Sequence, residues 1–297
     1  MSSLRTMRLR MRSVKNISQV TRALEAVSAA HVRKAQQRAL ATRPYARRAA
    51  AILHHLGEQS NIIANLHPLL QPRDPIANVL MVLVTGDRGL CGAYNVNICR
   101  AAMAFAHQFS APVKFIAVGR KGRDWLLRRR QTLIGEFTAL PLHPDLDSAA
   151  AIGRLVMEDF LNGTADEVYL AYMRYLTTLR QETQMQLLLP LQHTTAPVSG
   201  TEQQPFPLHG VYSYEPSAEE VLKVIVPRFI TLQVYQALLE ARASEHAARM
   251  LAMHNASEAA TALLNDLQLH YNKTRQLAIT SEMLDIVGGV EALGANQ

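Results

Sequence analysis

The stretch that decides the fold is MLAMHNASEAATALLNDLQLHYNKTRQLA, residues 250–278. Apolar or small side chains recur in it at alternating steps of three and four residues: Met250, Met253, Ser257, Ala260, Leu264, Leu267, Tyr271, Thr274 and Ala278. This spacing is typical of a helix whose narrow seam packs against a second helix. Neither glycine nor proline occurs between Arg228 and Val287, which predicts a helix about 90 Å long. A seam of that length needs a partner.

The N-terminal region is the predicted partner helix. From Ser3 to Leu56 there is no glycine and a single proline, Pro44, which we expect to kink the helix. Its apolar seam is predicted to slip in register once, and comprises Leu4, Met7, Met11 and Val14, then Ile17, Val20, Leu24 and Val27. The two terminal helices are therefore predicted to form an antiparallel coiled coil. Pro227 is expected to break or bend the first turns of the C-terminal helix.

The middle of the chain has a different period. Apolar runs at 79–84, 113–118, 167–175 and 181–191 predict strands, and the segments 95–109, 124–130 and 147–161 predict helices. Alternating strands and helices favour a small, mostly parallel, Rossmann-like α/β domain. The predicted organisation is an N-terminal shaft helix (1–56), a linker (57–77), a central α/β domain (78–212) and a C-terminal shaft helix (213–297).

Positive charge is concentrated at the N-terminus. Residues 1–50 hold twelve Lys or Arg and one acid, Glu25, a net charge of +11, whereas the whole chain has +7. Such a helix indicates an anionic partner: phosphate, lipid headgroups or an acidic protein surface. A solvated face is the alternative interpretation, although exposed helices usually gain from pairs of opposite charge.

One glycine-rich loop, GDRGLCG at 86–92, follows the first predicted strand. It lacks the Lys and Ser/Thr of a phosphate-binding loop, because Ala93 and Tyr94 follow its last glycine. We expect a tight turn whose glycines adopt positive φ angles, and no nucleotide site.

Chemistry-bearing residues form no recognisable set. No Ser/His/Asp or Cys/His combination emerges, and Cys91 and Cys99 match no metal or redox spacing, so they are expected to be reduced packing residues. The sequence therefore predicts no catalytic residue, cofactor or metal. No apolar run approaches the roughly 18 residues that span a bilayer. No transmembrane segment is expected.

Together these segments resemble the γ subunit of F-type ATP synthases, the central rotor shaft. The resemblance covers nearly the whole chain and is strongest in its C-terminal part. The matching segments are 17–27 (ISQVTRALEAV), 33–36 (RKAQ), 43–45 (RPY), 86–92 (GDRGLCG), 214–216 (YEP), 244–253 (SEHAARMLAM) and 267–289 (LQLHYNKTRQLAITSEMLDIVGG). Leu24, His254 and Val290-Glu291 depart from the usual pattern.

The resemblance implies a non-catalytic rotor on the cytoplasmic face of a bacterial membrane, which couples proton flow to ATP synthesis or hydrolysis. Its implied partners are three α and three β subunits around the paired helices, an ε subunit and the membrane c-ring. Implied contacts with the β subunits are Arg22, Leu24, Glu245, Arg249, Arg275, Gln276 and Thr280. Implied contacts with the ring or the small stalk subunit are Arg43, Tyr45, Tyr214 and Glu215.

The sequence is also compatible with two other functions. The basic helix is compatible with a nucleic-acid-binding arm, which would bind DNA or RNA tightly and with strong salt dependence. The α/β domain is compatible with a small-molecule enzyme, which would need a pocket of converging polar groups.

Overall fold

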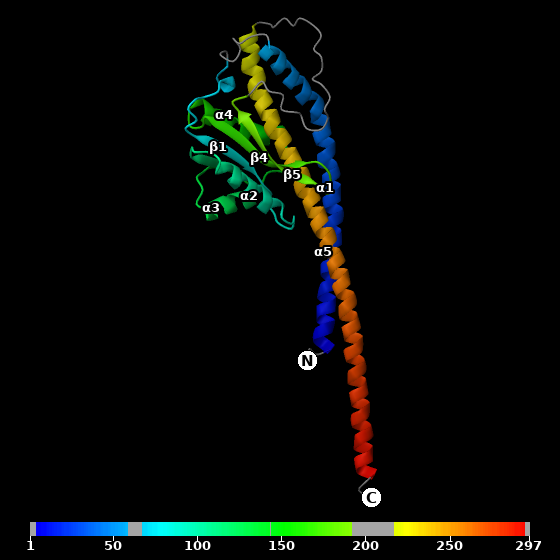
Figure 1. Cartoon of the computed structure of the whole chain (residues 1–297). Coiled ribbons are helices and arrows are strands. Elements are labelled where there is room, and N and C mark those ends of the chain that lie inside the picture. Colours follow the sequence, from blue (N-terminus) through cyan, green and yellow to red (C-terminus); the bar gives the residue numbers. More distant parts are fainter. Residues whose placement is uncertain (1–3, 59–66, 143, 192–216, 295–297) are drawn as a thin grey trace. The chain divides into compact units, whose positions relative to one another are not determined.

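The computed structural model describes residues 4–58, 67–142, 144–191 and 217–294 (Figure 1). The chain forms two compact units, one of Met1–Val27 with Met250–Gln297 and one of Ser28–Arg249. Both terminal helices contribute to both units. The elements are α1 (Leu4–Glu58), η2 (Pro68–Leu70), β1 (Val79–Val84), α2 (Tyr94–Ala106), β2 (Val113–Val118), α3 (Arg120–Arg128), β3 (Leu133–Phe137), α4 (Leu146–Leu161), β4 (Glu167–Tyr175), β5 (Gln181–Leu189) and α5 (Ala218–Gly294).

The first unit is a pair of helices, drawn in blue and in orange to red in Figure 1. The guanidinium of Arg8 donates to the hydroxyl of Tyr271 at 2.6 Å, and Nδ1 of His254 lies 3.0 Å from the Glu25 carboxylate. As the residue number rises along α1, that of its partner on α5 falls. The pair is therefore antiparallel.

The predicted seam of α5 is confirmed. All nine of its predicted residues are buried or half-buried, while the residues between them are mostly exposed. Met253, Ser257, Ala260 and Tyr271 are at most 8% exposed. Serine and alanine leave little side chain between two helices, so the partner backbone can approach closely.

The predicted register slip in α1 is wrong. Ile17, Val20 and Val27 are 51%, 58% and 53% exposed, so they lie outside the seam. The seam instead continues at unbroken heptad spacing. It first passes through polar residues, Ser18, Thr21, Glu25 and Ser28, and then returns to the apolar residues Val32 and Ala35. Thr21 satisfies its own hydroxyl by donating to the carbonyl of Ile17 at 3.0 Å, which lets a polar residue be buried there.

In the second unit, a five-stranded sheet has the order β3-β2-β1-β4-β5. β1 pairs in parallel with β2 and β4, β2 with β3 in parallel, and β5 is antiparallel to β4. This confirms the predicted fold class, a mostly parallel α/β domain with long terminal helices. β3 was missing from the sequence prediction. It is a five-residue edge strand that contains Gly135, and both features weaken a strand signal.

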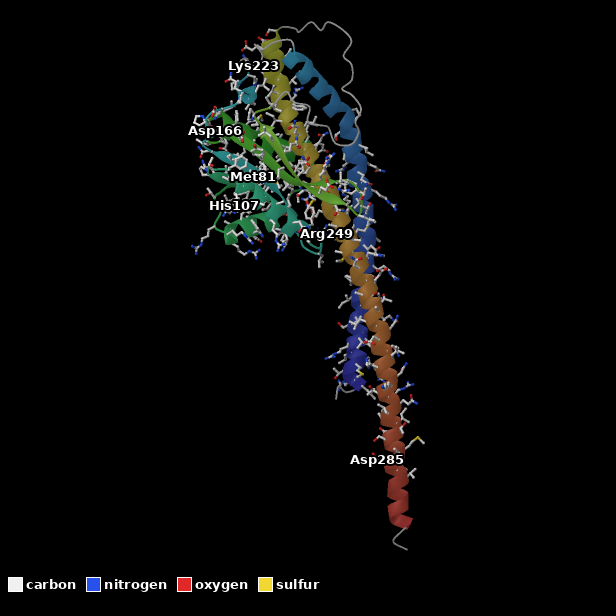
Figure 2. The ribbon with its side chains drawn as sticks, in the orientation of Figure 1. Met81, His107, Asp166, Lys223, Arg249 and Asp285 are labelled. Carbon is white, nitrogen blue, oxygen red and sulfur yellow. The ribbon has the colours of Figure 1, made fainter. Side chains whose placement is uncertain are left out.

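Two apolar cores cover the two faces of the sheet. One core includes Met81 of β1, labelled in Figure 2, and packs α2 and α3 against the sheet. The other brings α4 and the first turns of α5 onto the opposite face. Its buried α5 residues are Leu222, Val226, Ile230, Val234, Ala237, Leu238 and Ala241. The first part of α5 is thus a core helix of the α/β domain.

Pro227 does not break α5, which is helical from Ala218 to Gly294. Within Glu219–Gly288, one window has a mean hydropathy of 1.3 and passes as a membrane span by length and composition. Because 44% of it is buried in the structure, the packing of a core helix accounts for it as well.

Trp125 on α3 makes a cation–π contact with Arg129. The guanidinium carbon of Arg129 is 3.7 Å from the centre of the indole ring, well within cation–π range. Arg129 lies in the basic run Arg128–Arg130, so this stacking uses one of three neighbouring positive charges.

Both cysteines are free and buried, as predicted. Burial raises the pKa of Cys99 to about 12 and also raises the pKa of Cys91. Because folding raises the pKa of both thiols, their contribution to stability is complete below the unfolded pKa of 9.0. The contribution of Cys99 is lost as the pH rises from there to about 12.

We predict that the register of α1 can be tested with one substitution made at two positions. Val32→Ala, at a side chain that is 4% exposed, is expected to lower the free energy of unfolding by about 1.5–3 kcal/mol. Val20→Ala is expected to change it by less than about 0.5 kcal/mol. Urea unfolding followed by circular dichroism measures both. An equal loss of unfolding free energy in both variants would mean that Val20 lies in the seam, as the slipped register predicts.

We also predict that the thiols react slowly. At pH 8 the folded chain is expected to react with an aromatic disulfide reagent at least about 100-fold more slowly than the urea-unfolded chain, because the thiolate is the nucleophile. Absorbance of the released thiol measures the rate. Rapid modification of the folded chain would show that a cysteine is accessible and ionised.

Candidate functional site

The glycine-rich loop follows β1 at the carboxyl edge of the sheet. Ligands of open α/β sheets bind outside this edge, where strand order reverses. The order reverses here between β1 and β4, because the chain runs from β1 to β2 and β3 on one side and then crosses to β4 on the other. The candidate site is therefore the space between the loop 85–92 and the part of α5 that packs over it.

The loop adopts a different conformation from the predicted one. Of its glycines, only Gly92 has a positive φ, 56°, while Leu90 adopts a φ of 63°. Gly86 is needed for another reason. A Cβ built on Gly86 would lie 2.8 Å from Oε1 of Glu245, so only glycine lets α5 bring this carboxylate so close to the loop.

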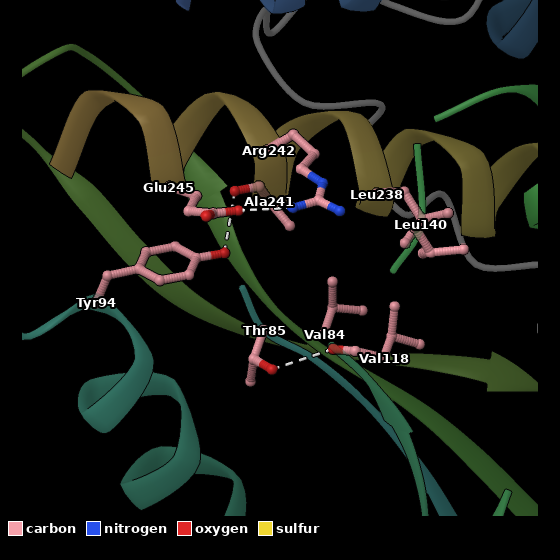
Figure 3. A pocket seen from close by; sticks show the side chains of 9 residues that line it. All are labelled: Val84, Thr85, Tyr94, Val118, Leu140, Leu238, Ala241, Arg242 and Glu245. Carbon is pink, nitrogen blue, oxygen red and sulfur yellow. Dashed lines mark hydrogen bonds and ion pairs between the residues drawn. The ribbon is translucent and has the colours of Figure 1, made fainter. Parts of the chain in front are cut away.

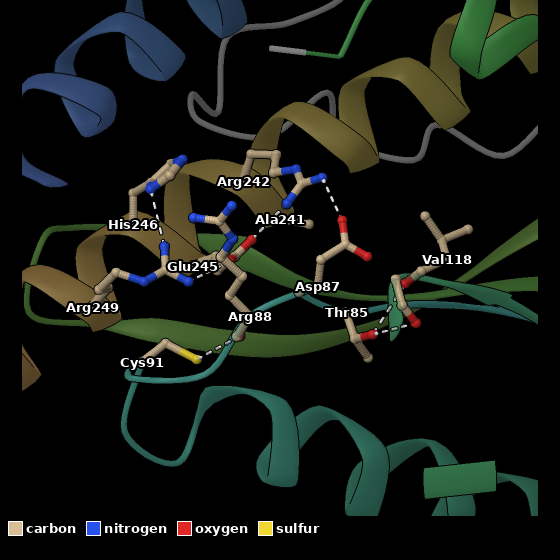
Figure 4. Close-up of polar contacts among 12 residues, drawn as sticks. Thr85, Asp87, Arg88, Cys91, Val118, Ala241, Arg242, Glu245, His246 and Arg249 are labelled. Atoms are coloured by element: carbon tan, nitrogen blue, oxygen red, sulfur yellow. Dashed lines mark hydrogen bonds and ion pairs between the residues drawn. The ribbon is translucent and has the colours of Figure 1, made fainter. Parts of the chain in front are cut away.

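Charged side chains of α5 fill the space above the loop (Figure 4). Glu245 is 3% exposed and accepts from Arg242 at 2.9 Å and from Arg249 at 2.5 Å. Arg242 lies 3.7 Å from Asp87 of the loop, and Arg249 donates to the carbonyl of Gly89 at 3.4 Å. We call Asp87, Arg242, Glu245 and Arg249 the ion cluster. Its formal charges cancel.

Beside the ion cluster, Tyr94 closes the edge (Figure 3). Its hydroxyl donates to the carbonyl of Ala241 at 3.0 Å, and its burial together with the nearby Glu245 charge raises its pKa well above the usual value. The remaining cavity is about 10 Å³, close to the volume that one water molecule needs. Small-molecule sites are larger by more than an order of magnitude. A cavity of this volume does not accommodate a nucleotide.

His246 lies between the ion cluster and α1. Its ring stacks on His31 of α1 with 4.9 Å between ring centroids, and Arg249 lies 3.3 Å from its Nδ1. Burial, with the neighbouring positive charges opposed by Glu245, lowers the pKa of His246 to about 4. The ring is therefore neutral at neutral pH.

Elsewhere in the second unit, a surface hollow of about 610 Å³ lies between α2 and β5. Its lining contains one carboxylate, Glu182, and neither histidine nor cysteine. Within the described part of the chain, no group of three His, Cys, Asp or Glu side chains is arranged to hold a metal.

The residues predicted to contact a β subunit fall into two sets. Glu245 and Arg249 pair with each other, and Arg249 also donates to the Gly89 carbonyl of the loop, so both side chains are already engaged inside the chain. Burial does not favour an intersubunit contact by Glu245, which stays a prediction. The other predicted contacts are on surfaces: Arg22, Arg275, Gln276 and Thr280 are exposed, and Leu24 is half-buried.

An internal hydrogen bond of Thr280 narrows the contact that is predicted for it. Its hydroxyl donates to the carbonyl of Gln276 at 2.9 Å, so toward a partner it is available only as an acceptor. The predicted ring or small-stalk contacts Arg43, Tyr45, Tyr214 and Glu215 lie outside the residues whose side chains the structure describes.

The internal partners of α5 were not predicted from the sequence. Arg242, Glu245 and Arg249 stand three and four residues apart, a spacing that indicates ion pairs on one helix face. That signal predicts neither their burial nor Asp87, which comes from a loop more than 150 residues away. The pairs Arg8–Tyr271 and Glu25–His254 were missed as well.

Comparisons with known proteins agree over the whole length. A family model described as ATP synthase matches residues 3–293. An ATP synthase gamma chain of Herpetosiphon aurantiacus is 44% identical, one of Roseiflexus castenholzii is 43% identical, and one of Dehalococcoides mccartyi is 40% identical. Each alignment covers 99% of this chain and at least 99% of the relative.

Solved structures share the fold. The central stalk and c-ring structure of the Tetrahymena thermophila mitochondrial ATP synthase contains a chain with a TM-score of 0.62 and 24% identity, covering 80% of this chain and 99% of that one. A rotor chain of the Euglena gracilis enzyme has a TM-score of 0.62 and 19% identity, with 93% and 98% covered. With full-length relatives at 40% identity or more and a family model over residues 3–293, the chain belongs to the gamma-chain family of ATP synthases.

Proposed function

We propose that this chain is the non-catalytic rotor subunit of a proton-translocating F-type ATP synthase. In this function it couples proton flow through a membrane ring to ATP synthesis or hydrolysis in β subunits by rotating. The observation that carries the proposal is the antiparallel helix pair with an unbroken seam, in a chain of the gamma family.

The surface of the first unit supports insertion into a ring of subunits. Arg10, Arg12, Lys15 and Arg22 are exposed on α1, which suits an acidic lever on a β subunit. The last described turns of α5 are apolar and exposed, a pattern that marks interaction surfaces. Their side chains are Met283, Leu284, Ile286 and Val287, at 57–68% exposure.

The second unit supports a mechanical function over a catalytic one. The edge at which such sheets bind ligands is occupied by the ion cluster and Tyr94. A nucleotide would have to displace a buried, charge-neutral cluster, which is costly because each ion would lose its partners.

The proposed partners are three α and three β subunits around the helix pair, and an ε subunit and the c-ring at the other end. The proposed location is the cytoplasmic face of a bacterial membrane, without a transmembrane segment of this chain. Arg43, Tyr45, Tyr214 and Glu215 are proposed contacts at the ring end.

The proposal predicts co-assembly and rotation. Co-expressed with the α and β subunits of its own organism, the tagged chain is expected to purify with both, and ATP is expected to rotate a bead fixed to the α/β domain. The isolated chain is expected to give no calorimetric signal with ATP. Absence of α and β subunits from the purified material, or salt-sensitive nucleic acid in their place, would contradict the proposal.

We further predict a grip point formed by Arg275, Gln276 and Thr280. Alanine at all three is expected to preserve the helix, because alanine has the highest helix propensity. Hydrogen bonds of about 0.5–3 kcal/mol each would be lost, which predicts a roughly tenfold fall in ATP turnover of the assembled enzyme.

The matched control shifts the change along the same helix. Thr261, Gln268 and Asn272 are also exposed polar residues of α5. Their triple alanine variant is expected to retain wild-type turnover. Equal turnover in both triple variants would mean that Arg275, Gln276 and Thr280 are merely solvated.

A further inference from the structure

We infer that the ion cluster of Asp87, Arg242, Glu245 and Arg249 is the torsional joint between α5 and the α/β sheet. It keeps the helix from turning about its own axis relative to the sheet, so that torque passes from one to the other. This inference rests on the proposed function, because it concerns how a rotor transmits torque.

The position of the cluster along the chain is the first argument. Arg249 is the last residue of the second unit, and α5 continues into the first unit from Met250. The cluster therefore lies at the end of the segment that α5 contributes to the second unit. Torque carried by α5 must pass through this stretch.

The kind of contact changes at the same place. From Leu222 to Leu238, α5 is held by apolar side chains, whose attraction does not depend on direction. From Ala241 to Arg249, hydrogen bonds and ion pairs, which require particular orientations, are added to the apolar contacts of Ala241, Ala243 and Ala247. A directional contact resists rotation of a helix, whereas an apolar one tolerates small turns and slides.

Bonds reach this stretch from several sides. The loop after β1 supplies Asp87 and the Gly89 carbonyl, and Tyr94 of α2 binds the Ala241 carbonyl. From β4, the carbonyl of Met173 accepts from Ser244 at 3.0 Å. Three elements thus hold nine residues, about two and a half turns of helix.

Two glycines of one loop provide a matched test. A Cβ on Gly86 would lie 2.8 Å from Oε1 and 2.9 Å from Cδ of Glu245, whereas a Cβ on Gly89 has nothing within 4 Å. The atoms that Gly86→Ala displaces are the far end of a flexible side chain. The fold can therefore survive Gly86→Ala while the Glu245 carboxylate moves out of its place between the arginines.

The experiment uses the chain assembled with its α and β subunits. A bead is fixed to Ala104→Cys on the exposed face of α2, since Cys91 and Cys99 are buried. The angular variance of the bead is recorded while the rotor pauses for ATP. Gly86→Ala is expected to raise that variance about twofold, because the bonds of Glu245 to both arginines are disturbed. Gly89→Ala is expected to match the unsubstituted chain.

Two further variants make the result decisive. Gly86→Ala with Glu245→Asp is expected to restore a low variance, because the shorter side chain makes room for the added methyl group. Glu245→Gln is expected to raise the variance as Gly86→Ala does. A change in stability alone would lower the yield of complexes without altering the variance of those that rotate.

The outcomes separate the two proposals. If the unsubstituted complex does not rotate, the proposed function fails. If it rotates, and the assembled Gly86→Ala and Glu245→Gln variants show unchanged variance, the joint lies elsewhere and the inference is overturned. If Glu245→Gln does not assemble, Gly86→Ala against Gly89→Ala decides.

Discussion

A single carboxylate, that of Glu245, lies buried between the guanidinium groups of Arg242 and Arg249. Two buried cations with no anion between them would be strongly destabilising, so the position of this carboxylate constrains everything around it. Gly86 leaves room for it, because a Cβ there would displace the Glu245 carboxylate. The loop after β1 must therefore lie close to α5, and α5 must cross the sheet at its carboxyl edge.

That crossing changes what the α/β domain can do. The fold usually leaves its carboxyl edge open to a ligand, and the loop after the first strand usually contributes to binding it. In this chain the same edge and the same loop hold a helix of the same polypeptide. Tyr94, the first residue of α2, is buried, and its hydroxyl donates a hydrogen bond to the Ala241 carbonyl. A scaffold common among nucleotide-binding proteins here holds a long helix of its own chain in place.

Periodic apolar patterns in the sequence predicted the long helices, the central strands and the seam of α5. They failed in α1, where the seam is built from Ser18, Thr21, Glu25 and Ser28 while Ile17 and Val20 are exposed. The reason is geometric. A close helix pair selects small side chains and specific polar pairs such as Glu25–His254, and a hydrophobicity pattern records neither. β3 was missed because a short edge strand buries too little surface to require a continuous apolar run.

The candidate site was only partly predictable. The loop lacks the residues of a phosphate-binding loop, which the sequence alone shows. Its expected conformation was wrong, because Gly86 has no positive φ and instead makes room for Glu245, 159 positions away. Contacts between distant segments leave no local trace in a single sequence. The exposure of Arg275, Gln276 and Thr280 followed from helix geometry alone, since it depends only on the seam being correctly placed.

The stacking of Arg129 on Trp125 has a practical consequence. Trp125 is the only tryptophan of the chain, and it lies in the unit of residues 28–249. Intrinsic indole fluorescence therefore reports on that unit alone, and its emission will shift when the guanidinium leaves the ring and water replaces it. Far-ultraviolet dichroism, by contrast, is dominated by the two long helices. Recording both signals during one thermal scan turns a single native side chain into a test of cooperativity, because coincident curves mean that the two units melt as one.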